Sequence, residues 1–321
     1  MTSTHSQTQG PAITVSGLRK AYGEVEAVRG VSFEVARGEV FCLLGPNGAG
    51  KTTTVEILEG YRFRTGGDVR VLGHDPAAGE RELREAVGIV LQQCGVQQDL
   101  TVRELVEMYG RYHDRSRPVD EVIELVELTE KRNVRATNLS GGQRRRLDLA
   151  LALVGDPELI FLDEPTTGFD PAARRQAWST IRSLCELGKT IFLTTHFMDE
   201  AQALADRVAV MRGGEIIASG RPDEIGGRDL RPAEIRFALP PSWSLGDIPD
   251  VPSVGREIQA DRVTVLTREP VVASHEITTW ALEHDVELAH FSVTQPTLED
   301  IYLALTGSGD QHEMTNQEVV R

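Results

Sequence analysis

The stretch "GPNGAGKTT", residues 45–53, decides the fold of this chain. It has a glycine, four further residues, and then glycine, lysine and threonine, which is the pattern of a phosphate-binding loop when a buried strand precedes it and a helix follows. Both neighbours are present, because the apolar run "VFCLLG" ends at Gly45 and the next stretch, "TTTVEILEG", has a helical composition. The sequence therefore predicts a P-loop between a strand and a helix.

The loop has the residues that binding of a nucleoside triphosphate requires. Glycines allow the backbone to turn its N–H groups toward a phosphate, and the N-terminus of the following helix adds its dipole. Lys51 is expected to reach the β- and γ-phosphates, and the hydroxyl of Thr52 to ligate Mg²⁺. A glycine-rich turn without a ligand is the alternative, and the strand and helix on either side argue against it. The expected nucleotide-binding residues are Gly45, Pro46, Asn47, Gly48, Ala49, Gly50, Lys51, Thr52 and Thr53.

Other apolar runs predict that this loop belongs to an α/β domain. "LIFLDE" (159–164) and "TIFLTTH" (190–196) are nearly continuous apolar runs that end in polar residues, as strands buried on both faces of a parallel sheet do. In open α/β sheets, ligands bind beyond the carboxyl ends of such strands. The polar residues at these ends are therefore the candidates for chemistry.

Changes of pattern along the chain define the expected domains. Between Leu100 and Gly155 the apolar spacing turns helical, which predicts a helical subdomain inserted into the α/β domain. Glycine, proline and charge around 224–232 indicate a linker. The expected divisions are a flexible N-terminal tail (1–11), a nucleotide-binding domain (12–225) with its helical subdomain (about 94–156), a small C-terminal α+β domain (226–307) and a disordered tail (308–321).

Two adjacent carboxylates, Asp163 and Glu164, end the run "LIFL". Because parallel strands bring their carboxyl ends to one edge, both are expected near the P-loop. We expect Asp163 to hold Mg²⁺ through water and Glu164 to act as general base on the attacking water, a role typically worth about 10² to 10⁴ in rate. The alternative is that one of the two only caps the following turn.

His196 ends a third apolar run, and Gln92 follows "VGIVL" in the same way. A histidine at a strand end is on its own most often structural, but its place beside the other two sites favours a role in the chemistry. Gln92 is a neutral side chain that is expected to contact both a metal and the helical subdomain. Gln93 beside it leaves this assignment open by one residue.

A second stretch, "NLSGGQRRR" (138–146), also has features of an anion site. Ser140 and Gln143 form a capping box for a helix through "LDLALALVG". A cap does not explain Gly141 and Gly142 in the first turn, where each glycine costs about 1 kcal/mol relative to alanine. Nor does it explain three arginines near the positive end of a helix dipole, where cations are disfavoured. The sequence therefore predicts a helix start that is built for an anion.

Composition and charge exclude several classes of protein. The chain has 321 residues, a formal net charge of -15 and three cysteines. The charge argues against a nucleic-acid partner, which would need dense Lys and Arg, and the scattered cysteines argue against a disulfide framework or a zinc site. No apolar stretch reaches the roughly 18 residues that span a bilayer, and the polar N-terminus is not expected to be a signal peptide. We therefore expect a cytoplasmic protein.

Taken in order, "GPNGAGKTT", Gln92, "LSGGQ", "LIFLDE", "GFD" and His196 closely resemble the nucleotide-binding subunits of ABC (ATP-binding cassette) transporters. They match the Walker A, Q-loop, signature, Walker B, D-loop and H-loop motifs of that family. The resemblance covers roughly residues 13–225. It implies a RecA-like P-loop NTPase core with a β-subdomain and an inserted helical subdomain, and it implies ATP and Mg²⁺ as cofactors.

The resemblance also implies roles for single residues. Tyr22 would stack on adenine, although the sequence alone allows a packed strand aromatic equally well. Glu164 would be the base, and His196 would contact the γ-phosphate and help to hold the attacking water. Asp170 would lie at a dimer seam, where the preceding Phe169 replaces the more usual leucine and changes the packing without loss of chemistry.

In the family, two cassettes meet head to tail, so the signature of one closes on the ATP of the other. The implied partner is thus a second copy of this chain, in a symmetric ATP-dependent homodimer. Mg²⁺ would be held by Thr52, Gln92 and Asp163. The residues that would contact the other copy's ATP are Ser140, Gly141, Gly142 and Gln143.

The later part of the chain narrows the class. "LTTHFMDEAQALADRVAVMRGGEIIASG" and "PTLEDIYLALTG" look like the multidrug and antibiotic-resistance exporter branch, typified by daunorubicin-type ATPase subunits that work with ABC-2 type permeases. The resemblance implies an ATPase on the inner face of the cell membrane, bound through its permease, that drives export of a drug, antibiotic or other small amphipathic substrate. The C-terminal domain is expected to be an accessory dimerisation or regulatory module.

Two other classes share part of this pattern. A soluble ABC ATPase of translation or DNA maintenance would resemble two fused cassettes or carry long coiled coils between Walker A and signature, whereas this chain has one cassette and no sustained heptads. A P-loop GTPase or kinase would leave the signature and His196 without a use. The exporter subunit is therefore the leading hypothesis, and the soluble ABC ATPase is the alternative.

Overall fold

The computed structural model describes residues 10–90, 97, 99–240, 242–259 and 261–306. The chain divides into two compact units, Met1–Pro222 and Asp223–Arg321. Each unit has a hydrophobic core of its own, one built around the strands that carry the P-loop and the other between a sheet and a helix near the C-terminus.

The first unit is centred on a six-stranded sheet with the strand order β5-β6-β7-β3-β8-β9. Neighbouring strands are parallel except for the last pair, β8 and β9, which is antiparallel. Three of the strands are buried along their whole length, which explains their continuous apolar sequences. The strands are β3 (Val40–Leu44), β5 (Val87–Val90), β6 (Leu159–Asp163), β7 (Thr190–Thr195), β8 (Arg207–Arg212) and β9 (Glu215–Gly220).

The register of the sheet brings the polar strand ends together. Leu44, the last residue of β3, pairs with Thr195 at the end of β7, and Asp163 at the end of β6 pairs with Thr194. The phenyl rings of Phe41, Phe161 and Phe192, one from each strand, pack against one another in the core, with the Phe41 ring stacked on the Phe192 ring and the Phe161 ring tilted against it. The core thus fixes the strand ends that carry the P-loop, the two acids and His196.

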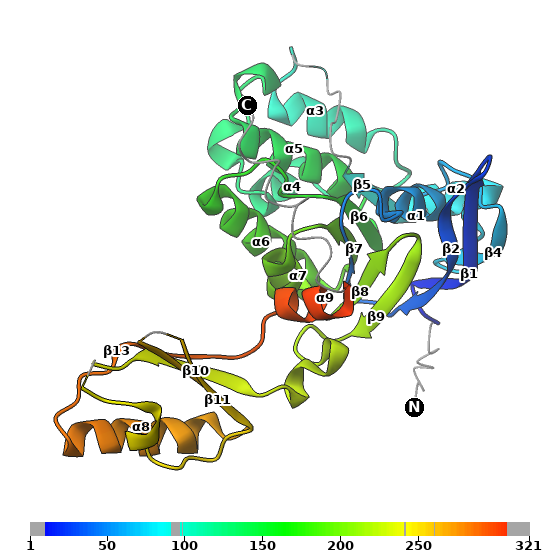
Figure 1. The fold of residues 1–321 in the computed structure, drawn as a ribbon. Coiled ribbons are helices and arrows are strands. Elements are labelled where there is room, and N and C mark those ends of the chain that lie inside the picture. Colours follow the sequence, from blue (N-terminus) through cyan, green and yellow to red (C-terminus); the bar gives the residue numbers. More distant parts are fainter. Residues whose placement is uncertain (1–9, 91–96, 98, 241, 260, 307–321) are drawn as a thin grey trace, which may run out of the picture. The chain divides into compact units, whose positions relative to one another are not determined.

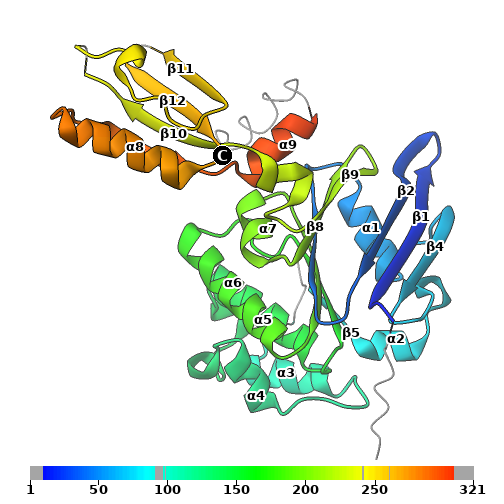
Figure 2. The same ribbon diagram turned by 90° about the horizontal axis from the view of Figure 1, so that it is seen from below.

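A second, antiparallel sheet and a set of helices complete the first unit (Figures 1 and 2). The sheet has the order β2-β1-β4, with α1 against β2 and β4, while α3, α4 and α5 pack on one another. Its strands are β1 (Ile13–Tyr22), β2 (Val25–Val35) and β4 (Gly66–Val71). The helices are α1 (Lys51–Leu58), η1 (Pro76–Ala78), α2 (Arg81–Ala86), α3 (Val102–Gly110), α4 (Val119–Leu125), η2 (Thr129–Lys131), η3 (Ala136–Asn138), α5 (Gly141–Leu153), α6 (Pro171–Glu186) and α7 (Met198–Leu204).

The second unit is a four-stranded antiparallel sheet with the order β11-β12-β10-β13 and a helix, α8, on one face (Figure 2). Ile277 and Trp280 of α8 pack against Ile235, Phe237 and Val265 of the sheet. The elements are η4 (Ile225–Leu230), β10 (Ala233–Ala238), η5 (Leu245–Asp247), β11 (Gly255–Gln259), β12 (Arg262–Thr267), α8 (Pro270–Glu283), β13 (Ala289–Thr294) and α9 (Leu298–Thr306).

Several elements differ from the sequence-based expectation. The helical pattern expected between Leu100 and Gly155 is interrupted after α4, because Glu127 adopts a left-handed conformation with φ of 54°. The expected C-terminal α+β domain includes a strand, β11, that no apolar pattern predicts, since its residues are mostly polar and exposed. Glycines 226 and 227 of the expected linker have positive φ and lie within η4. Among the described residues, no helix is both long and apolar enough to cross a bilayer.

Candidate active site

The P-loop between β3 and α1 has a backbone path that only glycine allows at its key positions. A Cβ atom on Gly45 would lie 2.3 Å from the carbonyl oxygen of Met211, and one on Gly50 would lie 2.4 Å from that of Ala27. Gly48 and Gly50 also have positive φ, at 78° and 104°. A side chain at these positions would force the loop to move, so the glycines define the shape of the loop.

Lys51 begins α1 and its ammonium group is held over this loop. Its side chain is only 4% exposed, and Nζ donates to the carbonyl oxygens of Gly45 at 2.8 Å and Pro46 at 3.1 Å. Burial lowers the pKa of Lys51, although the carboxylate of Glu164, with Oε1 at 3.7 Å from Nζ, opposes this effect. Thr52 beside it is exposed, so its hydroxyl is accessible.

Asp163 ends β6 as a buried carboxylate. Its Oδ1 accepts a hydrogen bond of 2.5 Å from the hydroxyl of Thr194 on β7. Burial raises the pKa of Asp163 above its usual range. The same hydroxyl oxygen, Thr194 Oγ1, also accepts a hydrogen bond of 3.2 Å from the backbone N–H of Glu164. One threonine therefore orients both acids. Thr194 was not predicted as a site residue, although it is a polar side chain near the end of the apolar run "TIFLTTH".

Glu164 lies at the centre of the site. Its Oε1 is 3.2 Å from Nδ1 of His196 and 3.7 Å from Nζ of Lys51, and its Oε2 accepts a hydrogen bond from the Thr167 hydroxyl at 3.1 Å. The contact with His196 lowers the pKa of Glu164 to about 2. The positive charge of Lys51 lowers it as well, whereas burial alone would raise it. The carboxylate is thus ionised and faces the Lys51 ammonium group and the His196 ring.

The structure therefore brings together four of the predicted residues from three neighbouring strand ends: Lys51, Asp163, Glu164 and His196. The His196 ring is 26% exposed and lies against the Phe197 ring, with 4.0 Å between centroids. Hydrolysis of a nucleoside triphosphate requires a group of this kind: a buried ammonium group, a carboxylate that can bind a metal ion, and an ionised glutamate, all beside a glycine-rich loop.

The second glycine stretch lies at the start of α5, in a different neighbourhood. This helix packs against α3, α4, α6 and β5, whereas α1 packs against β2, β4 and β6. The predicted capping box is confirmed, because the Gln143 N–H donates to Ser140 Oγ at 3.3 Å and the Ser140 N–H donates to Gln143 Oε1 at 3.1 Å. Gly141 is exposed and its Cβ position is open. The helix start is thus capped, with room beside Gly141.

Comparison with known proteins gives the family. A family model described as "ABC transporter" matches residues 28–167, and one described as "ABC transporter domain-containing protein-like, C-terminal domain" matches residues 233–297. The chain is 37% identical over 306 residues to the daunorubicin resistance ATP-binding protein DrrA3 of Streptomyces coeruleorubidus, covering 92% of this chain and 96% of the relative. The chain belongs to the ABC transporter ATP-binding proteins. It is accordingly an ATPase with the P-loop NTPase fold.

Further relatives agree with this assignment. The Nod factor export ATP-binding protein I of Rhizobium johnstonii is 40% identical over 306 residues, covering 92% of this chain and 95% of the relative. A dimeric ATP-binding cassette in a post-hydrolysis state with ADP and phosphate has a TM-score of 0.58 at 26% identity, covering 65% of this chain and 98% of that one. A second similar structure is that of cbiO1 from Clostridium perfringens, part of the ABC transporter complex cbiONQ. Its TM-score is 0.59 at 28% identity, covering 67% of this chain and 90% of the cbiO1 chain.

Two further ABC motif positions are exposed in this chain. Tyr22 ends β1 with 41% of its surface exposed, and Lys20 Nζ and Arg62 Cζ lie 4.9 Å and 5.4 Å from its ring centroid. Asp170 of the D-loop caps α6, where its Oδ1 accepts from the N–H groups of Ala172 and Ala173 at 2.8 Å and 2.9 Å. The Q-loop candidates Gln92 and Gln93 lie outside the described residues.

Two of the three arginines that follow the signature have acceptors within the chain, so the prediction of an anion at this helix start stays a prediction that does not need them. Arg145 donates to the carbonyl oxygens of Asp163 and Pro165, each at 3.3 Å. Arg146 lies 3.4 Å from the carbonyl oxygen of Glu127 and 3.2 Å from its carboxylate. Both side chains reach from α5 to acceptors in other segments of the chain.

Proposed function

We propose that this protein is the ATP-hydrolysing subunit of an exporter, which closes on ATP as a homodimer and drives a separate ABC-2 type permease. The observation that carries the proposal is the cluster of Lys51, Glu164 and His196 beside the glycine loop. Two relatives that match 92% of this chain are named for daunorubicin resistance and for Nod factor export. Their names support a small amphipathic cargo. The permease would hold the protein at the inner face of the cell membrane.

The residues present fit Mg²⁺ bound together with ATP. Thr52 offers an exposed hydroxyl at the loop, and Asp163 offers a carboxylate that Thr194 orients. Within the described residues, no group of three or more His, Cys, Asp or Glu side chains could hold a metal alone. This agrees with Mg²⁺, which usually takes only one or two carboxylates and binds substrate phosphates as well. When bound, Mg²⁺ would neutralise charge on the phosphate oxygens, with Gln92 as a further proposed ligand.

The charged groups of the site suggest how ATP prepares the base. Lys51 Nζ lies 3.7 Å from Glu164 Oε1 and balances the charge of that carboxylate. A bound γ-phosphate would attract the Lys51 ammonium group. The Glu164 carboxylate would then lose a cationic partner and face an anion, so its pKa would rise and it would become a stronger base for the attacking water. His196 would orient that water and contact the γ-phosphate.

The second half of each site would come from the other copy. Ser140, Gly141, Gly142 and Gln143 begin α5 with their capping box formed, which supports a rigid helix start suited to a phosphate. Because two identical chains pair about a two-fold axis, each pair would contain two equivalent sites. Asp170 would lie at the seam. Loss of the γ-phosphate would reopen the pair and move the helical subdomains against the permease.

The Glu164→Gln variant tests this proposal. We expect it to bind ATP and form dimers while turnover falls by about 100-fold or more, because the base is lost and the fold is kept. Phosphate release gives turnover, and size-exclusion chromatography with ATP gives the oligomeric state. Glu158→Gln is the matched control, since Glu158 lies next to the other end of β6 and pairs with Arg37. A Glu164→Gln protein that stays monomeric with ATP would contradict the shared site.

A further inference from the structure

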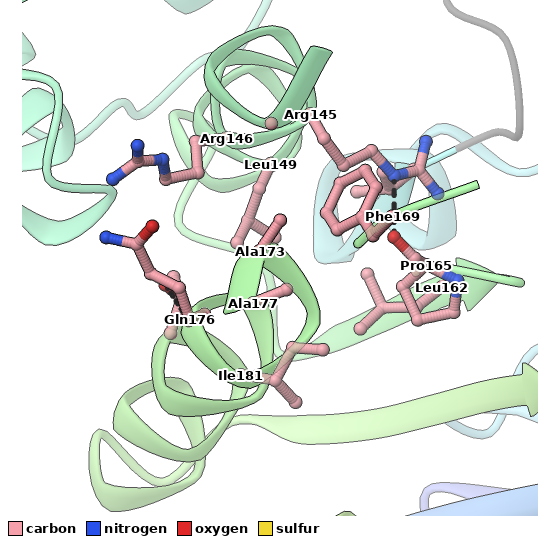
Figure 3. Close-up of a pocket in the computed structure, with 13 residues that line it drawn as sticks. Arg145, Arg146, Leu149, Leu162, Pro165, Phe169, Ala173, Gln176, Ala177 and Ile181 are labelled. Carbon is pink, nitrogen blue, oxygen red and sulfur yellow. Dashed lines mark hydrogen bonds between the residues drawn. The ribbon is translucent and has the colours of Figure 1, made fainter. Parts of the chain in front are cut away.

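Arg145 connects the signature helix to the Walker B turn of the same chain. It lies in the second turn of α5, and its guanidinium leaves the helix to reach the segment after β6 (Figure 3). Nε donates to the carbonyl oxygen of Pro165 and Nη2 to that of Asp163, each at 3.3 Å. These two carbonyls belong to the residues on either side of Glu164. Arg145 therefore holds the backbone before and after Glu164.

The backbone at Glu164 needs such support. Its φ is 46°, in the left-handed region, and a strained residue of this kind persists only where its surroundings hold it. On one side, the Thr194 hydroxyl oxygen on β7 accepts a hydrogen bond from the Glu164 N–H. Arg145 holds the two flanking carbonyls from the other. The direction of the Glu164 carboxylate toward His196 thus depends on both contacts.

The surroundings of Arg145 strengthen its hydrogen bonds. Its side chain is 13% exposed and borders an apolar pocket lined by Leu149, Leu162 and Phe169 (Figure 3). Hydrogen bonds from a charged donor are stronger than neutral ones, and low local polarity increases the difference. Asp148, with Oδ2 at 3.9 Å from Nη1, balances the buried charge.

We propose that Arg145 is a positioning residue for ATP hydrolysis, through which the signature helix sets the orientation of Glu164 in its own chain. The inference rests on the proposed role of Glu164 as the base. The start of the same helix, at Ser140, is the part assigned to the other copy's ATP. One rigid helix therefore links the nucleotide bound by the partner to the base that acts on this chain's own nucleotide.

Three variants of the full chain separate positioning from simple stability. Arg145→Leu should lower kcat for ATP by about 10- to 100-fold, because small misplacement of a reacting group has effects of this size. KM for ATP and ATP-dependent dimerisation should change by less than about twofold. Arg145→Gln keeps one donor and should recover part of kcat. Arg182→Leu is the control, since Arg182 also donates to a backbone carbonyl, that of Ala203, at 2.7 Å, and should leave kcat unchanged.

Mixed dimers with two different affinity tags show on which site Arg145 acts. A Glu164→Gln chain has no base, so only the site built on its partner's Walker motifs can turn over. Placing Arg145→Leu in the partner that keeps Glu164 should lower turnover of the pair by about 10- to 100-fold. Placing it in the Glu164→Gln chain, which supplies only the signature to that site, should leave turnover unchanged.

The outcomes are distinct. Loss of turnover only when Arg145→Leu is in the Glu164→Gln chain would mean that Arg145 shapes the signature for the partner's ATP, and the inference would be wrong. A parallel rise in KM and loss of dimerisation in Arg145→Leu would reduce Arg145 to a structural role, which also overturns it. Full turnover of the homodimeric Glu164→Gln protein would instead overturn the proposed function itself.

Discussion

At the residue scale, the site concentrates acidic groups near the P-loop helix, and one of them has no part in the proposed chemistry. Burial, together with the negative charges of Asp163 and Glu56, raises the pKa of Glu59 to about 8. Glu59 follows α1 directly, as its C-terminal cap residue. An acid whose pKa is raised in the folded state stabilises the fold only while it is protonated, so the fold becomes less stable as pH rises from the unfolded pKa through about 8.

The Glu59→Gln variant tests this balance. Glutamine imitates the protonated acid, so we expect the variant to be more stable than the native protein at pH 8.5, by about 1–3 kcal/mol in the free energy of unfolding. At pH 5 the native side chain is protonated in the fold, and the two proteins should differ little. Thermal unfolding at both pH values measures the difference. An equal gain at both values would show that the charge of Glu59 is not its cause.

Single residues of the site differ in how far the sequence could predict them. Lys51 and Glu164 were predictable because each lies at a fixed position in a motif next to an apolar run. Arg145 was not, since its acceptors are the carbonyls of residues 163 and 165, and no pattern in one stretch specifies a contact between separate elements. The left-handed backbone of Glu164 follows from that same tertiary context.

At the element scale, the apolar strands were predictable and the polar ones were not. Strands β3, β6 and β7 are fully buried, so their sequences are continuous apolar runs. Strand β11 lies at an edge of its sheet with its side chains mostly exposed. Burial therefore imposed no apolar pattern on it. The early end of α4 depends on one backbone conformation, at Glu127, that its helical sequence does not reveal.

Helices α3 and α5 begin with the same capping box, which allows a matched experiment. In α3 it is formed by Thr101 and Glu104, and in α5 by Ser140 and Gln143. Thr101→Ala and Ser140→Ala should each lower the free energy of unfolding by about 0.5–2 kcal/mol, because each removes a cap. Only Ser140→Ala should also lower turnover, by about tenfold or more, if that helix start faces the partner's ATP. Denaturant unfolding and phosphate release measure the two effects, and equal turnover of both variants would contradict the role of the signature.

At the scale of the whole molecule, the two units have separate cores, and the residues of the ATP site all come from the first. The core of Met1–Pro222 includes Phe41, Phe161 and Phe192, and that of Asp223–Arg321 includes Phe237 and Trp280. A domain with its own core can in principle fold alone. We therefore expect a chain that ends at Pro222 to fold, to bind ATP and to hydrolyse it at a rate within about threefold of that of the full chain.

The same truncation separates the ATPase from any accessory role of the second unit. Nucleotide binding and phosphate release measure the first unit, and co-purification with the membrane partner measures what Asp223–Arg321 adds. Loss of ATP binding on truncation would mean that the second unit supports the nucleotide site directly, against the expectation of an accessory domain. If ATP binding and turnover persist but dimers form only at higher protein concentration, the C-terminal unit contributes to pairing, because a second interface in the same symmetric pair adds its free energy to closure.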